Sequence, residues 1–209
     1  MTSAPRQGRL LVLGLGNVLC SDDGLGVMAV SALMRGFEWP PEVEVLDGGT
    51  LGLALLPYLD EAEAAILVDA IRGDAAPGSF MRLEGADVAP AVAQRLSPHQ
   101  VGVADLLDGA RWLDSYPARV VLLGLVPATI ELGVGCSPAV QAALPVLVDR
   151  LVEEIRGFGF DLVRRVANEA AGVLDGADVA GVLGLQGSER RLARSLSQDA
   201  GSRRTASID

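Results

Sequence analysis

Four short apolar runs recur along the chain, and segments with helical character separate them. The runs are residues 9–16, 43–49, 64–71 and 119–127, and two of them read "RLLVLGLG" and "AAILVDAI". Continuous apolar runs of this length are typical of strands that are buried on both faces. Strands that alternate with helices predict a mostly parallel, twisted sheet with helices on both faces, which is a three-layer α/β sandwich.

The helical segments are expected between and after these strands, at residues 24–36, 51–60, 97–113 and 137–157. Pro57 lies inside the second segment, so we expect that helix to be bent or broken there. Pro138 is expected in the first turn of the last helix. A fifth run, "GSFMRLE" at 78–84, alternates and follows 64–71 closely. It is expected to pair with 64–71 as an edge hairpin.

The pattern weakens after residue 157, and the charge balance changes there too. The net charge of the 209 residues is −10, and all of it falls within residues 1–156, because residues 157–209 hold as many basic as acidic side chains. We therefore predict a main domain at 1–157 and a C-terminal extension at 158–209 that is partly helical or disordered. Arginine pairs in this extension offer a docking surface, but a solvated extension is the simpler interpretation.

Composition excludes several classes of function. A strongly acidic chain is a poor general binder of nucleic acid. The chain has no lysine, which excludes mechanisms that use a Schiff-base or P-loop lysine. No apolar run is long enough to insert into a membrane, and the N-terminal residues lack the features of a secretory signal. Cys20 and Cys136 have no paired-ligand spacing, so we expect a reducing, cytoplasmic location.

Ionisable residues follow the predicted strands at the edge where such sheets bind ligands. Asp23 follows the first strand, Asp47 ends the second, Asp69 ends the third, and His99, the single histidine, opens the helix at 97–113. Each has a structural interpretation: Asp22 and Asp23 suit a helix start, and Asp47 before two glycines favours an Asx-turn. Their convergence on one edge favours a functional site, with Asp22 as the lesser member of its pair.

His99 lies in the segment Ser97-Pro98-His99-Gln100, which has the residues of a capping box. The first turn of a helix disfavours the imidazolium form, and a metal ligand must be neutral imidazole. Asp23, Asp69 and His99 therefore predict a site for Ni²⁺, Zn²⁺, Mn²⁺ or Fe²⁺. Three protein ligands leave coordination positions open, as catalytic sites require.

Two other classes of site fit less well. The dinucleotide fingerprint G-x-G-x-x-G has Gly14 and Gly16 here, but Leu19 in its third position, and the two aspartates would repel a pyrophosphate. A serine or cysteine hydrolase is the other class. This chain has no G-x-S-x-G motif, and we interpret Cys20 as a packing residue.

At these residues the chain resembles the hydrogenase maturation endopeptidases, which process the large subunit of [NiFe] hydrogenases. The resemblance covers about residues 10–157 and rests on several motifs in order: "LGLGNVLCSDDGLGV", "VEVLDGGTLGLALLPYL", "AILVDAIRGDAAPGSF", "LSPHQVGVADLL" and "VVLLGLVP". It implies a five-stranded α/β sandwich. It also implies that Asp23, Asp69 and His99 are the catalytic and metal-binding residues, with Asp23 where some members have glutamate.

The resemblance implies a nickel-dependent endopeptidase that removes the C-terminal extension of the large-subunit precursor after metal insertion. Nickel would be recognised in the substrate and need not be held tightly by the free enzyme. Either the metal polarises the scissile carbonyl or activates water, or a carboxylate acts as general base, in the manner of an aspartyl protease. A non-enzymatic nickel-binding or docking chaperone on the same fold is the alternative. We expect a monomer whose partner is the precursor.

Overall fold

The computed structural model describes residues 8–93 and 99–165, with the backbone alone described at residue 93 and residues 99–101. A central sheet has five strands in the order β3-β1-β4-β6-β5. The strands are β1 (Leu10–Leu15), β3 (Val43–Gly49), β4 (Ala64–Ala70), β5 (Phe80–Glu84) and β6 (Arg119–Leu125). The first four in sheet order are parallel, so the predicted sheet type is confirmed.

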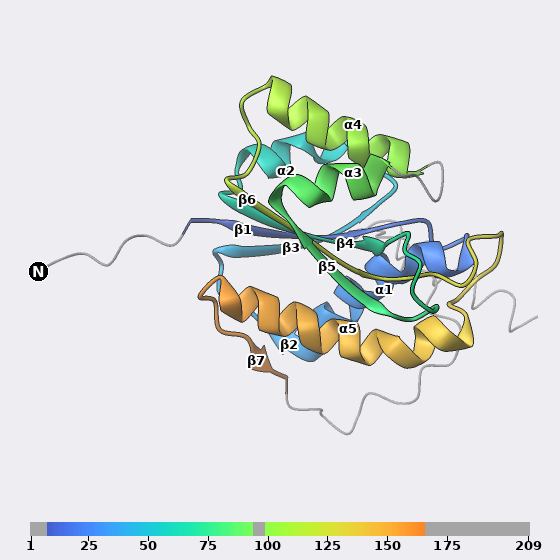
Figure 1. Ribbon diagram of the computed structural model, residues 1–209. Helices are drawn as coiled ribbons and strands as arrows, with labels where there is room; N and C mark the ends of the chain where they lie inside the picture. Colours follow the sequence, from blue (N-terminus) through green and yellow to red (C-terminus); the bar gives the residue numbers. More distant parts are fainter. Residues whose placement is uncertain (1–7, 94–98, 166–209) are drawn as a thin grey trace, which may run out of the picture. The chain divides into compact units, whose positions relative to one another are not determined.

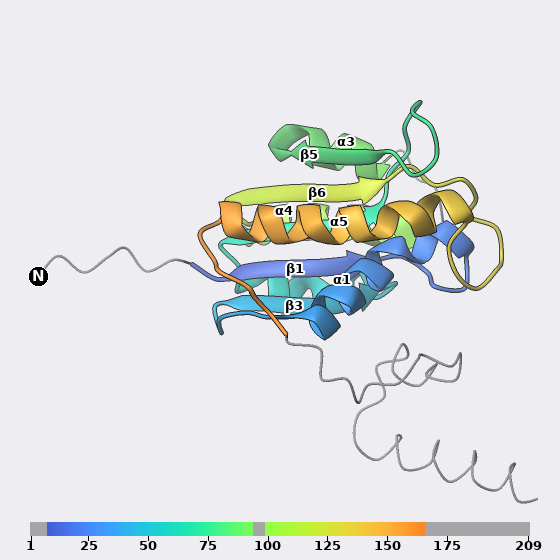
Figure 2. The same cartoon turned by 90° about the horizontal axis from the view of Figure 1, so that it is seen from below.

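Helices cover both faces of the sheet, as Figure 1 shows: α2, α3 and α4 lie on one side, and α1 and α5 lie on the other. Figure 2, seen from below, has α1 and α5 in front of the sheet. The helices are α1 (Leu25–Gly36), α2 (Leu56–Asp60), α3 (Val88–Ala93), α4 (His99–Trp112) and α5 (Pro138–Gly157). Short 3₁₀ turns, η1 (Ser21–Gly24), η2 (Gly52–Leu55) and η3 (Gly85–Asp87), precede α1, α2 and α3.

Strand β1 shows why both faces must be covered. All six of its residues are buried, and they alternate between two apolar cores because successive side chains of a strand point to opposite faces. Leu10 and Val12 pack with α1 and α5, whereas Leu11, Leu13 and Leu15 pack with the helices of the opposite face. The near-continuous apolar runs of the sequence therefore correspond to strands with two buried faces.

One predicted pairing is wrong. Strand β5 is an edge strand, but it pairs antiparallel with β6 and not with β4. Strand β4 already hydrogen-bonds to β1 on one side and to β6 on the other, so neither of its edges is available for a hairpin. The pairing of β5 was predicted from its closeness to β4 along the chain. It is instead determined by the two parallel neighbours that already occupy both sides of β4.

The predicted helices are present with the expected interruptions. The segment 51–60 is broken into η2 and α2, and Pro57 lies in the first turn of α2. Helix α5 begins at Pro138, and the Ser137 hydroxyl caps it by accepting a hydrogen bond from Val140 N–H. Helix α4 begins at His99. Ser97 and Pro98, the predicted cap, lie outside the described residues.

A small second sheet was not predicted. Strand β2 (Phe37–Glu38) pairs antiparallel with β7 (Val163–Arg164), and Phe160 and Leu162 before β7 are buried in the core. The described fold thus continues past α5 to residue 165. The predicted domain boundary after residue 157 stays a prediction, and most of the proposed extension lies outside the described residues. Within those residues no helix is long and apolar enough to cross a membrane.

Candidate active site

The turn after β1 is shaped by close packing of two backbone segments. Gly16 has φ of +121°, and a Cβ there would lie 1.8 Å from the carbonyl oxygen of Asp23. Gly26, in the first turn of α1, is equally constrained, because a Cβ there would lie 2.0 Å from the carbonyl oxygen of Val68. Glycine at these positions therefore lets the chain return against the strand ends and carry Asp23 to the sheet edge.

Asp23 lies in η1, directly before α1, and is fully buried. Its Oδ2 accepts a hydrogen bond from the Asn17 N–H at 3.0 Å. Asn17 Oδ1 accepts one from the Leu19 N–H at 3.0 Å, which is an Asx-turn. Asn17 was not predicted to belong to the site, although asparagine directly after Gly-x-Gly is a recognisable turn signal.

Asp69 is the next-to-last residue of β4, the central strand, and is 2% exposed. Its Oδ1 accepts a hydrogen bond from the Ala70 N–H at 2.7 Å. The turn η1 contacts β4, so Asp23 and Asp69 come to the same edge of the sheet from neighbouring strands. Two buried carboxylates at the carboxyl edge are costly to desolvate, which favours a role in binding a cation or handling protons.

His99 lies in α4, which the structure describes from His99 onward; its place in the first turn stays a prediction, because the predicted cap lies outside the described residues. Its imidazole is outside the description, and its contacts to Asp23 and Asp69 stay a prediction. Within the described side chains, no three metal-ligating groups gather at one point. The donor set of two carboxylates and one imidazole fits nickel, for which imidazole and oxygen ligands are suitable.

Asp22 has a larger role than the helix start that was expected. It is fully buried, and its carboxylate accepts hydrogen bonds from Ala128 N–H (2.8 Å), Thr129 N–H (3.2 Å), Ser137 N–H (2.6 Å) and the Ser137 hydroxyl (2.8 Å). Asp22 also donates its own N–H to the Thr129 carbonyl at 3.2 Å. It therefore clamps both ends of the loop between β6 and α5 onto the loop that carries Asp23. These partners lie more than 100 positions away, so no local pattern could have indicated them.

Asp47 at the end of β3 follows the structural interpretation. Its carboxylate accepts a hydrogen bond from the Gly49 N–H, which is the Asx-turn that the two glycines predicted. Surrounding protein atoms desolvate the carboxyl and raise its pKa, whereas the Gly49 N–H lowers it. Asp47 is exposed and lies in a turn, whereas Asp23 and Asp69 are buried.

The two cysteines are both free and partly buried. The Cys136 Sγ lies 3.4 Å from the Met28 Sδ. Burial, and then the negative charge of Asp22, raises the pKa of the Cys136 thiol to about 11. A thiol with so high a pKa is a poor nucleophile at neutral pH.

A mostly parallel α/β sandwich with buried carboxylates at the carboxyl ends of its strands defines the class of α/β proteins that bind and transform ligands at that edge. Residues 27–154 match the family model described as hydrogenase maturation protease. The hydrogenase 2 maturation protease of Escherichia coli is 36% identical over 160 residues, covering 76% of this chain and 98% of that protein. The HupD hydrogenase expression/formation protein of Rhodobacter capsulatus is 38% identical over 159 residues, covering 75% of each chain.

Solved structures agree with these matches. The hydrogenase maturating endopeptidase HybD from E. coli superposes with a TM-score of 0.72 at 35% identity, covering 75% of this chain and 98% of that one. The [NiFe] hydrogenase maturation protease HybD from Thermococcus kodakarensis gives 0.59 at 29% identity, covering 70% and 98%. The chain belongs to the hydrogenase maturation protease family. Its resemblance to that family, first drawn from sequence motifs, is confirmed.

Proposed function

We propose that this protein is an endopeptidase that removes a C-terminal extension from the large-subunit precursor of a [NiFe] hydrogenase once the metal has been inserted. The family supports the peptidase chemistry and the class of substrate. The observation that carries the site assignment is the burial of Asp23 and Asp69 at one edge of the sheet, beside the loop that Asp22 clamps.

Asp23, Asp69 and His99 would supply two oxygen ligands and one nitrogen ligand to a nickel ion that the substrate carries. That contact would recognise a loaded precursor and hold its scissile peptide bond at the sheet edge. In the hydrolysis itself, a water oxygen adds to the carbonyl carbon, the carbon–nitrogen bond breaks, and the leaving amine takes up a proton. Asp23 or Asp69 would accept the proton of that water, since the third buried carboxylate, Asp22, already accepts four hydrogen bonds from the 126–137 loop.

The fixed turn around Asp23 would contribute positioning rather than charge. Its Oδ2 is held by the Asn17 N–H, and its carbonyl oxygen packs so closely on Gly16 that no side chain fits at Gly16. A carboxylate oriented by backbone groups loses little entropy when substrate arrives, which is how a preorganised site accelerates a reaction.

The test is to incubate purified protein with the nickel-loaded precursor and with the metal-free precursor, and to follow the precursor mass. We expect C-terminal shortening of the loaded form alone. His99→Ala, Asp69→Asn and Asp23→Asn should each lower the cleavage rate by at least about 100-fold, since each removes a group that touches the reacting centre.

Asp47→Asn is the matched control, because it changes a strand-end carboxylate that lies in a turn. It should cleave at close to the normal rate. Equal cleavage by His99→Ala and the unaltered protein would remove His99 from the mechanism. A stable complex with the precursor but no shortening would show a docking function without proteolysis.

A further inference from the structure

The loop between β6 and α5, residues 126–137, is held by several hydrogen bonds although it has no regular secondary structure. Asp22 binds it at Ala128, Thr129 and Ser137. Between these clamps, Gly133 forms a parallel bridge to Cys20, in which Gly133 N–H donates to the Leu19 carbonyl (3.0 Å) and Ser21 N–H donates to the Gly133 carbonyl (2.8 Å). The loop therefore lies strand-like beside the segment that leads into Asp23.

Further contacts fix the same segment. The Ser21 hydroxyl donates to the Glu131 carbonyl at 3.0 Å, and Ser21 itself has φ of 51°, an uncommon conformation for a residue with a side chain. Figures 1 and 2 both show this loop, in olive, at the end of the sheet where β1 terminates, next to the turn before α1.

The outer side of this segment is unusually apolar and unusually exposed. Leu132 is 88% exposed and Val134 is 89% exposed, while Leu19 on the other side of the bridge is 57% exposed. Within the part of the chain that the structure describes, no hydrogen bond involves the N–H or C=O of Leu132 or Val134. A clamped segment that presents aliphatic side chains and free backbone groups to solvent has the properties of an edge that accepts another strand.

We propose that the segment 131–134 is the peptide-docking edge of the enzyme, on which an extended, apolar stretch of the protein substrate adds as a strand beside the cleavage site. This inference rests on the proposed function and names how its substrate is held. A protein substrate must present its scissile bond in an extended form, and strand addition provides that form through main-chain hydrogen bonds. Gly133 is bridged to Cys20, three residues before Asp23, so a strand bound to this edge would lie near the turn that carries Asp23.

Charge favours an apolar occupant. Residues 126–137 contain one charged side chain, Glu131, and residues 14–21 contain none. An acidic peptide would meet no cation in either segment, whereas aliphatic side chains would bury Leu132, Val134 and Leu19 on binding. Because the clamps hold the loop before substrate arrives, little ordering cost remains to be met at binding.

The first test is the double substitution Leu132→Ser/Val134→Ser, assayed with the full-length loaded precursor. Removal of the two aliphatic side chains should raise KM about tenfold and leave kcat within a factor of about two, because the change affects substrate binding and not the reacting groups. The matched control is Val146→Ser/Val163→Ser, since these valines are 52% and 66% exposed on α5 and β7, away from this loop. The control should leave both constants unchanged.

The second test reads the backbone directly and does not depend on turnover. Amide hydrogen exchange is measured on the unaltered protein, alone and with an excess of the loaded precursor, over times shorter than the precursor takes to be shortened. The amides of Leu132 and Val134 should exchange fast in the free protein and should slow at least tenfold in the complex. A complex that forms without this protection, or a double variant with normal KM, would overturn the docking edge.

The two proposals fail in different ways. If the unaltered protein shortens the precursor but the double variant does so with the same KM, only the docking edge is wrong. If the unaltered protein does not shorten the loaded precursor, the proposed function is wrong and the docking edge falls with it. The edge could instead bind a second copy of this chain, and light scattering on the same variants tests this. A change in oligomeric state with KM unaltered would show such self-association and overturn the docking edge.

Discussion

The two edges of the central sheet hold their carboxylates in opposite ways. At the amino end of β6, Glu84 and Glu154 face Arg82 and Arg119, with nitrogen–oxygen distances of 2.7–2.8 Å from Arg82 and 2.5 Å between Arg119 and Glu84. At the carboxyl edge, Asp22, Asp23 and Asp69 are buried, and the hydrogen bonds described above come to them from N–H groups and one hydroxyl.

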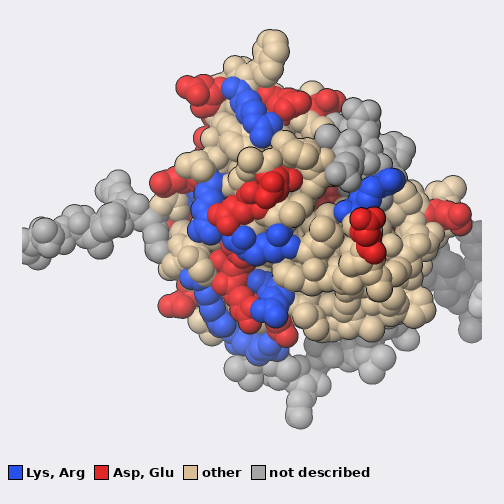
Figure 3. All heavy atoms as spheres, viewed as in Figure 1, with Lys and Arg blue, Asp and Glu red and all other residues tan. Residues whose placement is uncertain are grey.

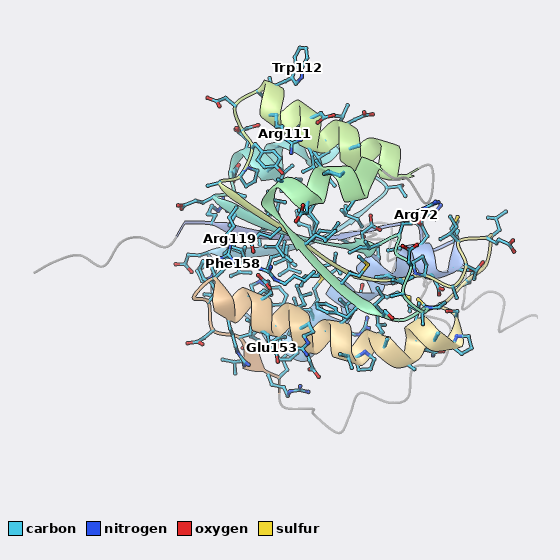
Figure 4. All side chains as sticks on the ribbon, viewed as in Figure 1. Arg72, Arg111, Trp112, Arg119, Glu153 and Phe158 are labelled. Carbon is cyan, nitrogen blue, oxygen red and sulfur yellow. The ribbon has the colours of Figure 1, made fainter. Side chains whose placement is uncertain are left out.

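The figures make the contrast visible. Figure 4 places Arg119 beside Phe158 at one end of the sheet, where the guanidinium stacks 4.2 Å from the ring centroid. Figure 3 shows red and blue side chains gathered over that half of this face, while the other half is mostly tan. Exposed charges that neutralise each other contribute little to stability. Buried carboxylates that are held by backbone donors fix a geometry, and their loss should be far more damaging.

The largest expected effect on the fold is at Asp22. Asp22→Ala would leave three N–H groups and one hydroxyl of the 126–137 loop without their acceptor, so we expect a loss of about 3–5 kcal/mol in the free energy of unfolding. Urea unfolding followed by circular dichroism measures it. Asp22→Asn, which keeps one acceptor oxygen, should lose less, and the same loss in both variants would show that the carboxylate does not clamp the loop.

Gly16→Ala should have the next largest effect. The added Cβ would lie 1.8 Å from the Asp23 carbonyl oxygen, and φ of +121° is unfavourable for alanine. We expect a loss of about 2–4 kcal/mol and a displaced Asp23, hence slower cleavage at saturating substrate. Gly85→Ala is the control, because that glycine also has positive φ, of 61°, but a Cβ there meets no atom within 4 Å. Equal losses in the two variants would show that backbone strain, and not contact with Asp23, is responsible.

The alkylation rate of Cys136 reports on burial and on the charge of Asp22 at the carboxyl edge. In a Cys20→Ser background, alkylation of Cys136 at pH 8 should be roughly 100-fold slower than in the urea-unfolded chain, because the folded pKa of about 11 leaves little thiolate. The rate should keep rising with pH toward 11. The free energy of unfolding changes in the opposite direction to the alkylation rate. Since the thiol ionises more easily in the unfolded chain, stability falls as pH rises from about 9 to 11. Asp22→Asn should speed the folded-state reaction by a smaller factor, as its charge is the lesser cause.

Much of this arrangement was predictable from local pattern, and the remainder depends on contacts between distant residues. The four parallel strands and the sheet edge that carries Asp23 and Asp69 follow from apolar runs that end in polar residues. The antiparallel pairing of β5 with β6 and the small sheet of β2 and β7 do not. Strand β5 pairs with β6 because both sides of β4 are occupied, and β2 and β7 lie far apart in the sequence. Likewise the Asx-turn at Asp47 is local, whereas the hydrogen bonds of Asp22 to Ser137 join positions that no periodicity connects.

The smallest expected effect lies at the opposite edge. Hydrogen bonds from Arg119 and then Arg82 hold the pKa of Glu84 below its usual value, so its ion pairs stabilise the fold above pH of about 4.5 and that contribution is lost as pH falls through the lowered pKa. The Glu84 side chain is 37% exposed, so solvent screens the pairs, and Glu84→Gln should cost only about 0.5–1 kcal/mol at pH 7 with cleavage unchanged. Unfolding at pH 7 and pH 3 measures it: the difference between the two proteins should shrink at pH 3. A loss as large as that of Asp22→Ala would remove the contrast between the two edges, because exposed and buried carboxylates would then matter equally.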